Sequence, residues 1–211
     1  MKIFEEIADE VVKGNSASVA DLTNKALSQD ISSGEILNKG LVAGMSVVSE
    51  KFKNNEIFIP EVLISARAMN SGLEIIKPLL AESEVESKGK VVIGTVKGDL
   101  HDIGKNIVSM LLQGAGFEVI DLGADVSKEK FVEFAKKEKA DILGMSALLT
   151  TTMLYMKETI DALQEAGLRK NIKVIIGGAP VTDAYASQIQ ADGYAPDAAS
   201  AVDLSKQLLS K

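Results

Sequence analysis

The fold is decided by the stretch Val91-Val92-Ile93-Gly94-Thr95-Val96, followed by Lys97-Gly98-Asp99-Leu100-His101-Asp102-Ile103-Gly104-Lys105-Asn106. The first six residues form a short apolar run rich in β-branched side chains, which is typical of a buried strand. From residue 102 to residue 112 the apolar side chains recur at helical spacing. A strand that leads directly into a helix is the repeating unit of parallel sheets covered by helices.

The same alternation continues to the C-terminus. Further strands are expected at 118–122, 140–145, 173–176 and near Tyr194, and further helices at 128–137, 153–168, 183–189 and 197–209. The expected strands are continuous apolar runs, as parallel strands require when helices bury both of their faces. The sequence therefore predicts an α/β domain at 90–211, with a doubly wound, flavodoxin-like or Rossmann-like parallel sheet of five strands.

The region before this domain has helical spacing throughout. Each of the four expected helices has a start or stop signal: Gly14-Asn15 after the first, Ser18 with Asp21 before the second, Ser32 with Glu35 as a capping box before the third, and Pro60 and Pro78 near the two ends of the fourth. Short connections between such helices predict a four-helix bundle domain at 1–82. The polar, aperiodic stretch 83–89 is the expected linker.

Composition excludes several classes of function. The chain of 211 residues has no Cys and a single His, so disulfide scaffolds, Cys-based metal sites and two-imidazole zinc sites are excluded. The net charge of −7 argues against a nucleic-acid partner. Acidic residues near the N-terminus and the lack of a long apolar run predict a cytoplasmic protein without membrane segments.

The topology predicts where a ligand binds. In a doubly wound sheet of this kind the site lies at the carboxyl ends of the first and third strands, which places loops 97–104 and 146–152 at the site, with 177–180 beside them. The chain's single imidazole, His101, lies on the first of these loops, two residues after Asp99. A lone His is more often structural than a ligand, and Asp99 could instead cap the helix near Asp102. The position of His101 on this loop favours a functional role.

The motif DxHxxG, formed by Asp99, His101 and Gly104, resembles the signature of cobalamin-binding modules. Ser146-Ala147-Leu148 resembles the SxL motif of the same modules, Gly177-Gly178 resembles their GG motif, and residues 52–69 resemble the helical cap that precedes the corrinoid domain in cobalamin-dependent methionine synthase. Nearly the whole chain resembles a cap plus cobalamin-binding module, as in the corrinoid proteins of methanol and methylamine methyltransferase systems.

The resemblance implies that cobalamin or a related corrinoid is the cofactor and that His101 is the ligand of its cobalt, displacing the cofactor's own base. Asp99 would hold the imidazole, and Thr152 would supply the hydroxyl of the family's proton relay. These three residues are the expected catalytic group. Thr152 stands where methionine synthase has Ser.

Further residues are implied as contacts of the cofactor. Around the corrin ring and the slot for the nucleotide tail they are Gly94, Asp102, Ile103, Gly104, Ser146, Leu148, Thr150, Gly177, Gly178, Ala179, Tyr194, Ala195 and Asp197. Small residues let a planar base approach the backbone closely, although each Gly could equally serve a turn or a helix–strand contact. Over the upper face of the cobalt the expected contacts are Phe52 and Ile59, whose alternative role is the core of the bundle.

The implied activity is methyl transfer through Co(I) and methyl-Co(III) forms of the cofactor. The chain would be a corrinoid subunit, non-catalytic or co-catalytic, that meets a donor-specific methyltransferase, an acceptor methyltransferase acting on a folate or a thiol, and a reductive activase. Two alternatives remain open. One is a cobalamin-dependent isomerase, sensor or regulator, and the other is a flavodoxin-like binding or phosphoacceptor module that uses Asp99 or Asp121.

Overall fold

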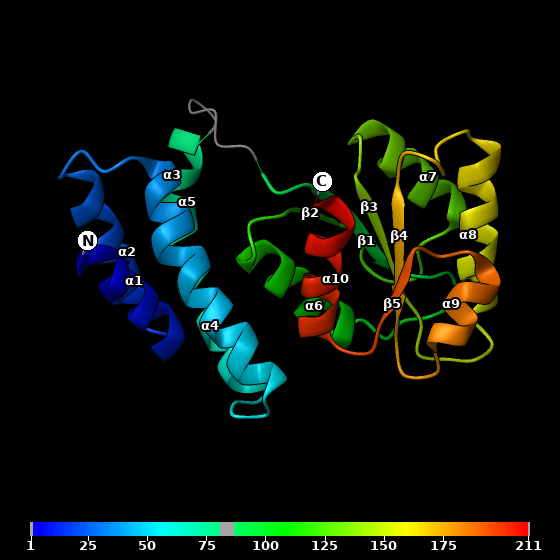
Figure 1. Cartoon of the computed structure of the whole chain (residues 1–211), viewed down its shortest axis with the longest axis horizontal. Coiled ribbons are helices and arrows are strands. Elements are labelled where there is room, and N and C mark those ends of the chain that lie inside the picture. Colours follow the sequence, from blue (N-terminus) through cyan, green and yellow to red (C-terminus); the bar gives the residue numbers. More distant parts are fainter. Residues whose placement is uncertain (1, 81–86, 211) are drawn as a thin grey trace. The chain divides into compact units, whose positions relative to one another are not determined.

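The computed structural model describes residues 2–80 and 87–210, and it divides into two compact units (Figure 1). Among the described residues, 2–80 and 114–116 form a helical unit, and 87–113 and 117–210 form an α/β unit. Of the expected linker at 83–89, residues 83–86 lie outside the described residues. The domain bounds 1–82 and 90–211 stay a prediction.

The helical unit is a bundle of α-helices with one π-helical segment. Its elements are α1 (Lys2–Lys13), α2 (Ser16–Leu27), α3 (Ser33–Glu35), η1 (Ile36–Leu41), α4 (Val42–Lys53) and α5 (Ile59–Leu80). One apolar face of each long helix is buried, and side chains such as Ile7, Val19, Leu41 and Ile76 are fully enclosed. Burying a side chain of this size contributes about 1.5–3 kcal/mol, so these faces hold the bundle together.

Two details of the bundle differ from the sequence prediction. The second helix begins at Ser16 and not at Ser18, because Asn15 is the N-cap and its side chain accepts the backbone N–H of Ser18. Ser32 caps the next helix, since its hydroxyl oxygen accepts the N–H of Glu35 at 3.3 Å and its hydroxyl donates to the Glu35 carboxylate. The helix that Ser32 opens widens into η1 before α4. Gly40 lies in η1, where an added Cβ would be 3.0 Å from Ile7, so η1 passes very close to α1.

The α/β unit contains a five-stranded parallel sheet in the order β2-β1-β3-β4-β5 (Figure 1). Its strands are β1 (Lys90–Thr95), β2 (Glu118–Asp121), β3 (Ile142–Ser146), β4 (Lys173–Gly177) and β5 (Gly193–Ala195). This is the predicted doubly wound topology, and β1 and β3 are neighbours at the point where the strand order reverses. The predicted fold class is confirmed.

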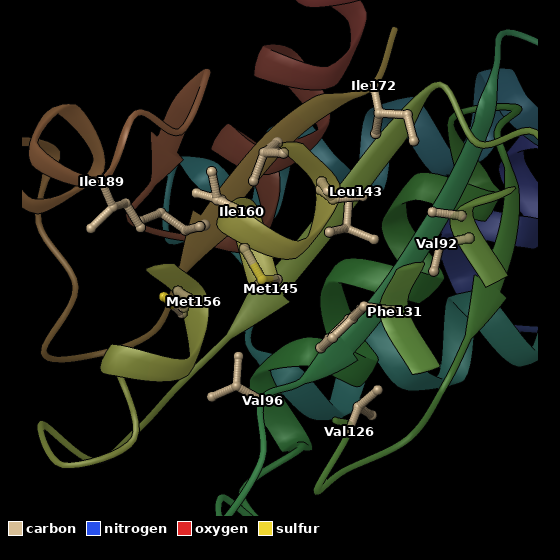
Figure 2. Packing of buried hydrophobic residues seen from close by; sticks show 14 of the residues in the cluster. Val92, Val96, Val126, Phe131, Leu143, Met145, Met156, Ile160, Ile172 and Ile189 are labelled. Carbon is tan, nitrogen blue, oxygen red and sulfur yellow. The ribbon is translucent and has the colours of Figure 1, made fainter. Parts of the chain in front are cut away.

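Five helices connect and cover the strands: α6 (Ile103–Gly114), α7 (Lys128–Lys137), α8 (Leu154–Glu165), α9 (Asp183–Ile189) and α10 (Ala198–Leu209). Figure 2 shows Val92, Leu143 and Met145 of the sheet in one apolar cluster with Phe131 of α7 and with α8 residues. This packing fixes the loops that leave the carboxyl ends of β1 and β3. None of the helices among the described residues is long and apolar enough to span a membrane.

Candidate functional site

The predicted ligand-binding loops leave the sheet at one edge. In the parallel ladders Thr95 of β1 pairs with Ser146 of β3, Ser146 pairs with Gly177 of β4, and Gly177 pairs with Ala195 of β5. The ends of four strands are therefore aligned. The loops that follow β1, β3 and β4 all start from this aligned row, which is where a doubly wound fold places its ligand.

Asp99, His101 and Thr152 form a hydrogen-bonded chain at this edge. The Nδ1 atom of His101 is 2.8 Å from Oδ1 of Asp99, and the hydroxyl of Thr152 donates to Oδ2 of Asp99, also at 2.8 Å. Asp99 and Thr152 are buried, whereas the side chain of His101 is 52% exposed. The chain thus leads from a buried hydroxyl through a buried carboxylate to an imidazole that a ligand can reach.

The Asp99 carboxylate also joins the loop after β1 to the loop after β3. It accepts the backbone N–H of His101 at 3.1 Å, of Leu148 at 2.7 Å and of Leu149 at 3.2 Å. Burial by itself raises the pKa of the Asp99 carboxyl, but the hydrogen bonds from Leu148, His101 and Thr152 outweigh burial and hold this pKa well below its ordinary value. None of these donors belongs to α6, so the carboxylate does not cap that helix.

The bond to Asp99 determines which nitrogen of His101 is free. An ionised carboxylate only accepts hydrogen bonds, so Nδ1 of His101 carries the proton and Nε2 keeps its lone pair in the neutral ring. Within the described residues no group hydrogen-bonds to Nε2. A histidine that binds a metal through one nitrogen and donates the other N–H to a carboxylate has this arrangement.

Large apolar side chains on the two loops that meet at Asp99 are open to solvent. Leu100, directly before His101, is 75% exposed, and Ile103, two residues after it, is 72% exposed. Leu148 and Leu149, whose N–H groups donate to Asp99, are 43% and 41% exposed. Apolar side chains gathered in this way mark a surface that a ligand or partner covers. They would suit the flat, largely apolar face of a macrocycle.

The donor set fits a metal that brings most of its own ligands. Among residues 2–80 and 87–210 there is no cluster of three or more His, Cys, Asp or Glu side chains that could hold a bare metal ion. A corrin ring supplies four nitrogens to its cobalt and asks the protein for one axial ligand. The single accessible imidazole within an apolar surface is therefore suited to a corrinoid, and the fold and the site together define a cofactor-binding module of this class.

Comparison with known proteins agrees with this class. Two family models, each described as a B12 binding domain, match residues 3–77 and 89–203. The chain is 46% identical to dimethylamine corrinoid protein 1 of Methanosarcina acetivorans over 99% of this chain and 98% of that protein. It is 45% identical to a corrinoid protein of Desulfitobacterium hafniense over 100% of this chain and 99% of that protein.

A solved structure is also similar over nearly the whole chain. A chain of the methanol:cobalamin methyltransferase complex of Methanosarcina barkeri is 34% identical with a TM-score of 0.89, and the match covers 99% of this chain and 80% of that chain. The protein described here belongs to the family of corrinoid proteins with B12-binding domains. Its cofactor is cobalamin or a related corrinoid, as the sequence predicted.

The glycines predicted to line the tail slot have different surroundings. Gly178 has φ +121°, and an added Cβ would lie 1.9 Å from the carbonyl oxygen of Ala147, so only glycine is accommodated there. Gly104 is open, with no atom within 4 Å of an added Cβ. At Gly94 that position is 3.0 Å from both Phe131 and Val126, so the missing side chain allows close packing on the sheet. A contact of Gly94 with the cofactor stays a prediction.

The other predicted contacts lie along the same edge. Ser146 is half-buried at the end of β3, and Thr150 and Ala179 are exposed on the loops after β3 and β4. Asp102 begins the first turn of α6, where its carbonyl accepts the N–H of Asn106. Three more lie at or after β5: Tyr194 is half-buried, Ala195 is buried, and Asp197 caps α10 by accepting the N–H of Ser200 at 2.7 Å.

Phe52 and Ile59 belong to the helical unit, at the end of α4 and the start of α5. Phe52 is half-buried and Ile59 is 41% exposed, so Ile59 is not part of the bundle core. Phe58, next to it, is 65% exposed. Their contact with the upper face of a corrinoid stays a prediction.

Two polar groups near the site were missed by sequence reasoning. Lys105 of α6 is almost fully buried and forms an ion pair with Asp121 at the end of β2, and Ser109 also donates to Asp121. Asp125 accepts a hydrogen bond from Gly98, in the loop that carries His101. The sequence did contain a signal for the pair of Lys105 and Asp121, because Lys105 lies among the apolar residues that form the buried face of α6.

Replacing Thr152 with Val should lower the free energy of unfolding of the apo-protein by about 1–2 kcal/mol, because a buried hydrogen bond to an ionised carboxylate is lost. Val keeps the methyl group and the shape of Thr152, so packing changes little. Thr152→Ser keeps the hydroxyl and should lose less than half as much. Urea unfolding of both variants measures the difference, and equal losses would show that the hydroxyl adds nothing.

Proposed function

We propose that this protein carries a methyl group on a corrinoid between two methyltransferases, with His101 as the axial ligand of the cobalt. The observation that supports the proposal most strongly is the imidazole of His101, which is exposed at the switch point of the sheet with Nδ1 bound to Asp99 and Nε2 free. When bound, the corrinoid supplies a cobalt centre that can accept a methyl group as a nucleophile and release it to an acceptor.

Neighbouring residues would orient the imidazole of His101 towards the metal. Asp99 holds the imidazole in the tautomer that presents Nε2 to the metal, and the buried hydroxyl of Thr152 and the backbone of Leu148 hold Asp99. Leu100 and Ile103, which are exposed on the loop and helix start around His101, would shield the bound imidazole from water. Because these contacts are made within the protein, the site is formed before the cofactor arrives.

The same contacts would keep the hydrogen bond between Asp99 and His101 in place. The pKa of Asp99 is held low by its hydrogen bonds, so this carboxylate stays ionised. Nδ1 of His101 already carries a proton that it shares with Asp99. Asp99 would therefore keep accepting the Nδ1–H, which leaves Nε2 as the nitrogen that would face the metal.

The relatives suggest which partners to test first. Proteins named as dimethylamine corrinoid proteins are 42–46% identical to this chain, whereas the matched chain of the methanol system is 34% identical. We therefore propose a methylated amine as the donor, presented by its own methyltransferase. A folate or thiol methyltransferase would accept the methyl group, and a reductive activase would restore the cobalt after accidental oxidation.

A methylation assay tests this function. The protein is loaded with cobalamin, reduced, and mixed with dimethylamine and the methyltransferase that uses it. Methanol, a methoxylated aromatic compound and methyl-folate are tested in parallel, each with its own methyltransferase. The expected result is the visible absorbance change of cobalt alkylation, fastest with the amine. Alkylation with another donor only would overturn the choice of donor, and no alkylation with any donor would contradict the carrier function.

A further inference from the structure

The segment 122–126, which follows β2, runs beside the loop that carries Asp99 and His101. The N–H of Thr95 donates to the carbonyl of Gly123 at 2.9 Å, and the N–H of Val126 donates to the carbonyl of Thr95, also at 2.9 Å. Val96 and Val126 form a further parallel bridge beyond the end of β1. The segment thus continues the sheet along the first residues of the loop.

Asp125 makes two reciprocal hydrogen bonds with this loop. Its N–H donates to the carbonyl of Asp99 at 3.0 Å, and its carboxylate accepts the N–H of Gly98 at 2.7 Å. The backbone of Asp125 is left-handed, with φ 53°. Glycine, Asn and Asp adopt this conformation most readily, and of these only Asn and Asp also offer a side-chain acceptor.

The far end of the segment is also fixed. Asp121 accepts the N–H of Gly123 at 2.8 Å and is held by the ion pair with buried Lys105 of α6. Asp99 is consequently held from two directions. Asp125 fixes its backbone, and the loop after β3 fixes its carboxylate through Leu148 and Thr152.

We infer that Asp125 is a positioning residue for the axial histidine, because its two hydrogen bonds fix Gly98 and Asp99 and thereby the direction in which Asp99 holds His101. The inference rests on the proposed function, in which His101 binds cobalt. Asp125 itself hydrogen-bonds to the backbone of Gly98 and Asp99 and not to the imidazole. Without the two hydrogen bonds of Asp125, the loop at 97–101 would sample other conformations. The equilibrium between His-bound and His-free cobalt would then shift towards the His-free form.

Three substitutions at one position separate the side-chain acceptor from the backbone conformation. Asp125→Asn keeps both, Asp125→Gly keeps only the left-handed backbone, and Asp125→Ala keeps neither. Each variant is labelled with ¹⁵N at its single histidine, loaded with cobalamin and reduced to Co(II). Electron paramagnetic resonance then measures the fraction of protein in which the ¹⁵N of the histidine, and not the cofactor's own base, is coupled to the cobalt. Thermal unfolding of the apo-proteins is recorded beside it. Asp30→Ala is the matched control, since Asp30 is also left-handed, with φ 58°, but lies between α2 and α3.

The expected result is that Asp125→Ala and Asp125→Gly raise the ratio of His-free to His-bound protein about tenfold, while Asp125→Asn changes it less than about twofold. Asp30→Ala should reduce thermal stability without changing the ratio. Unchanged ratios in the Ala and Gly variants would overturn the inference, as would a Gly variant that behaves like wild type. A wild-type protein in which the labelled histidine is not coupled to the cobalt would instead overturn the assignment of His101, and the inference with it.

Discussion

His101→Ala is expected to bind the corrinoid but to lose the spectrum of the histidine-bound form completely. The loop after β3 and the Gly177-Gly178 turn remain for the nucleotide tail, so we expect the affinity to fall by about tenfold to 100-fold, equivalent to about 1.4–2.7 kcal/mol. No other imidazole of the protein can replace the lost ligand, because His101 is the only histidine of the chain. Visible absorbance of the loaded protein, titrated with cobalamin, measures both effects.

Added imidazole provides the control for this variant. It should enter the space left by the side chain and restore a nitrogen-bound spectrum, because Asp99 stays in place through its bonds to Leu148, Leu149 and Thr152. The apo-variant should unfold at nearly the wild-type urea concentration, since the side chain of His101 is half exposed. A variant with the wild-type spectrum would show that His101 is not the axial ligand.

Asp99→Asn should weaken histidine ligation by about 10-fold to 100-fold. The amide of Asn has one acceptor and one donor end, whereas both oxygens of Asp99 accept hydrogen bonds. If the carbonyl end remains toward Leu148 and Thr152, the amide N–H faces Nδ1 of His101 and moves the ring proton to Nε2. That tautomer has no lone pair at Nε2 to offer the metal.

The opposite orientation of the side-chain amide in the Asp99→Asn variant is also unfavourable. The N–H groups of Leu148 and Leu149 would then face a donor inside the protein, and we expect the free energy of unfolding to fall by about 2–4 kcal/mol. Asp161→Asn is the matched control, because it removes an exposed carboxylate that only pairs with Lys157 on α8. Cobalamin titration and urea unfolding are the measurements. An Asp99→Asn protein with wild-type stability and spectrum would rule out the role given to Asp99.

Local signals predicted much of the fold. Helices α7 and α9 begin and end where the sequence placed them, because Ser127 and Thr182 cap their first turns. The strands are within one or two residues of the prediction, since each is a short apolar run between polar loops. Asp99, His101 and Thr152 are brought together because the strand order β2-β1-β3-β4-β5 places the loops after β1 and β3 side by side.

The features that were missed depend on contacts between distant parts of the chain. The start of α2 was misplaced because Asn15 and Ser18 are both good capping residues, and the choice between them is made in the folded bundle. The π-helical segment contains Gly40, which lies close to Ile7 of α1, and no local sequence signal indicates this contact. The clamp of Asp125 on Gly98 joins residues 27 positions apart, and no sequence pattern indicates it.

Selective labelling of the single histidine with ¹⁵N tests the central claim most directly. The labelled protein is loaded with cobalamin and reduced to Co(II), and its electron paramagnetic resonance spectrum is compared with that of unlabelled protein. If Nε2 of His101 is the axial ligand, each cobalt line split into three by ¹⁴N must be split into two by ¹⁵N. A three-line splitting that survives labelling would mean that the cofactor's own base remains bound, and a spectrum with no axial nitrogen would mean that the metal has neither ligand; both would contradict the account.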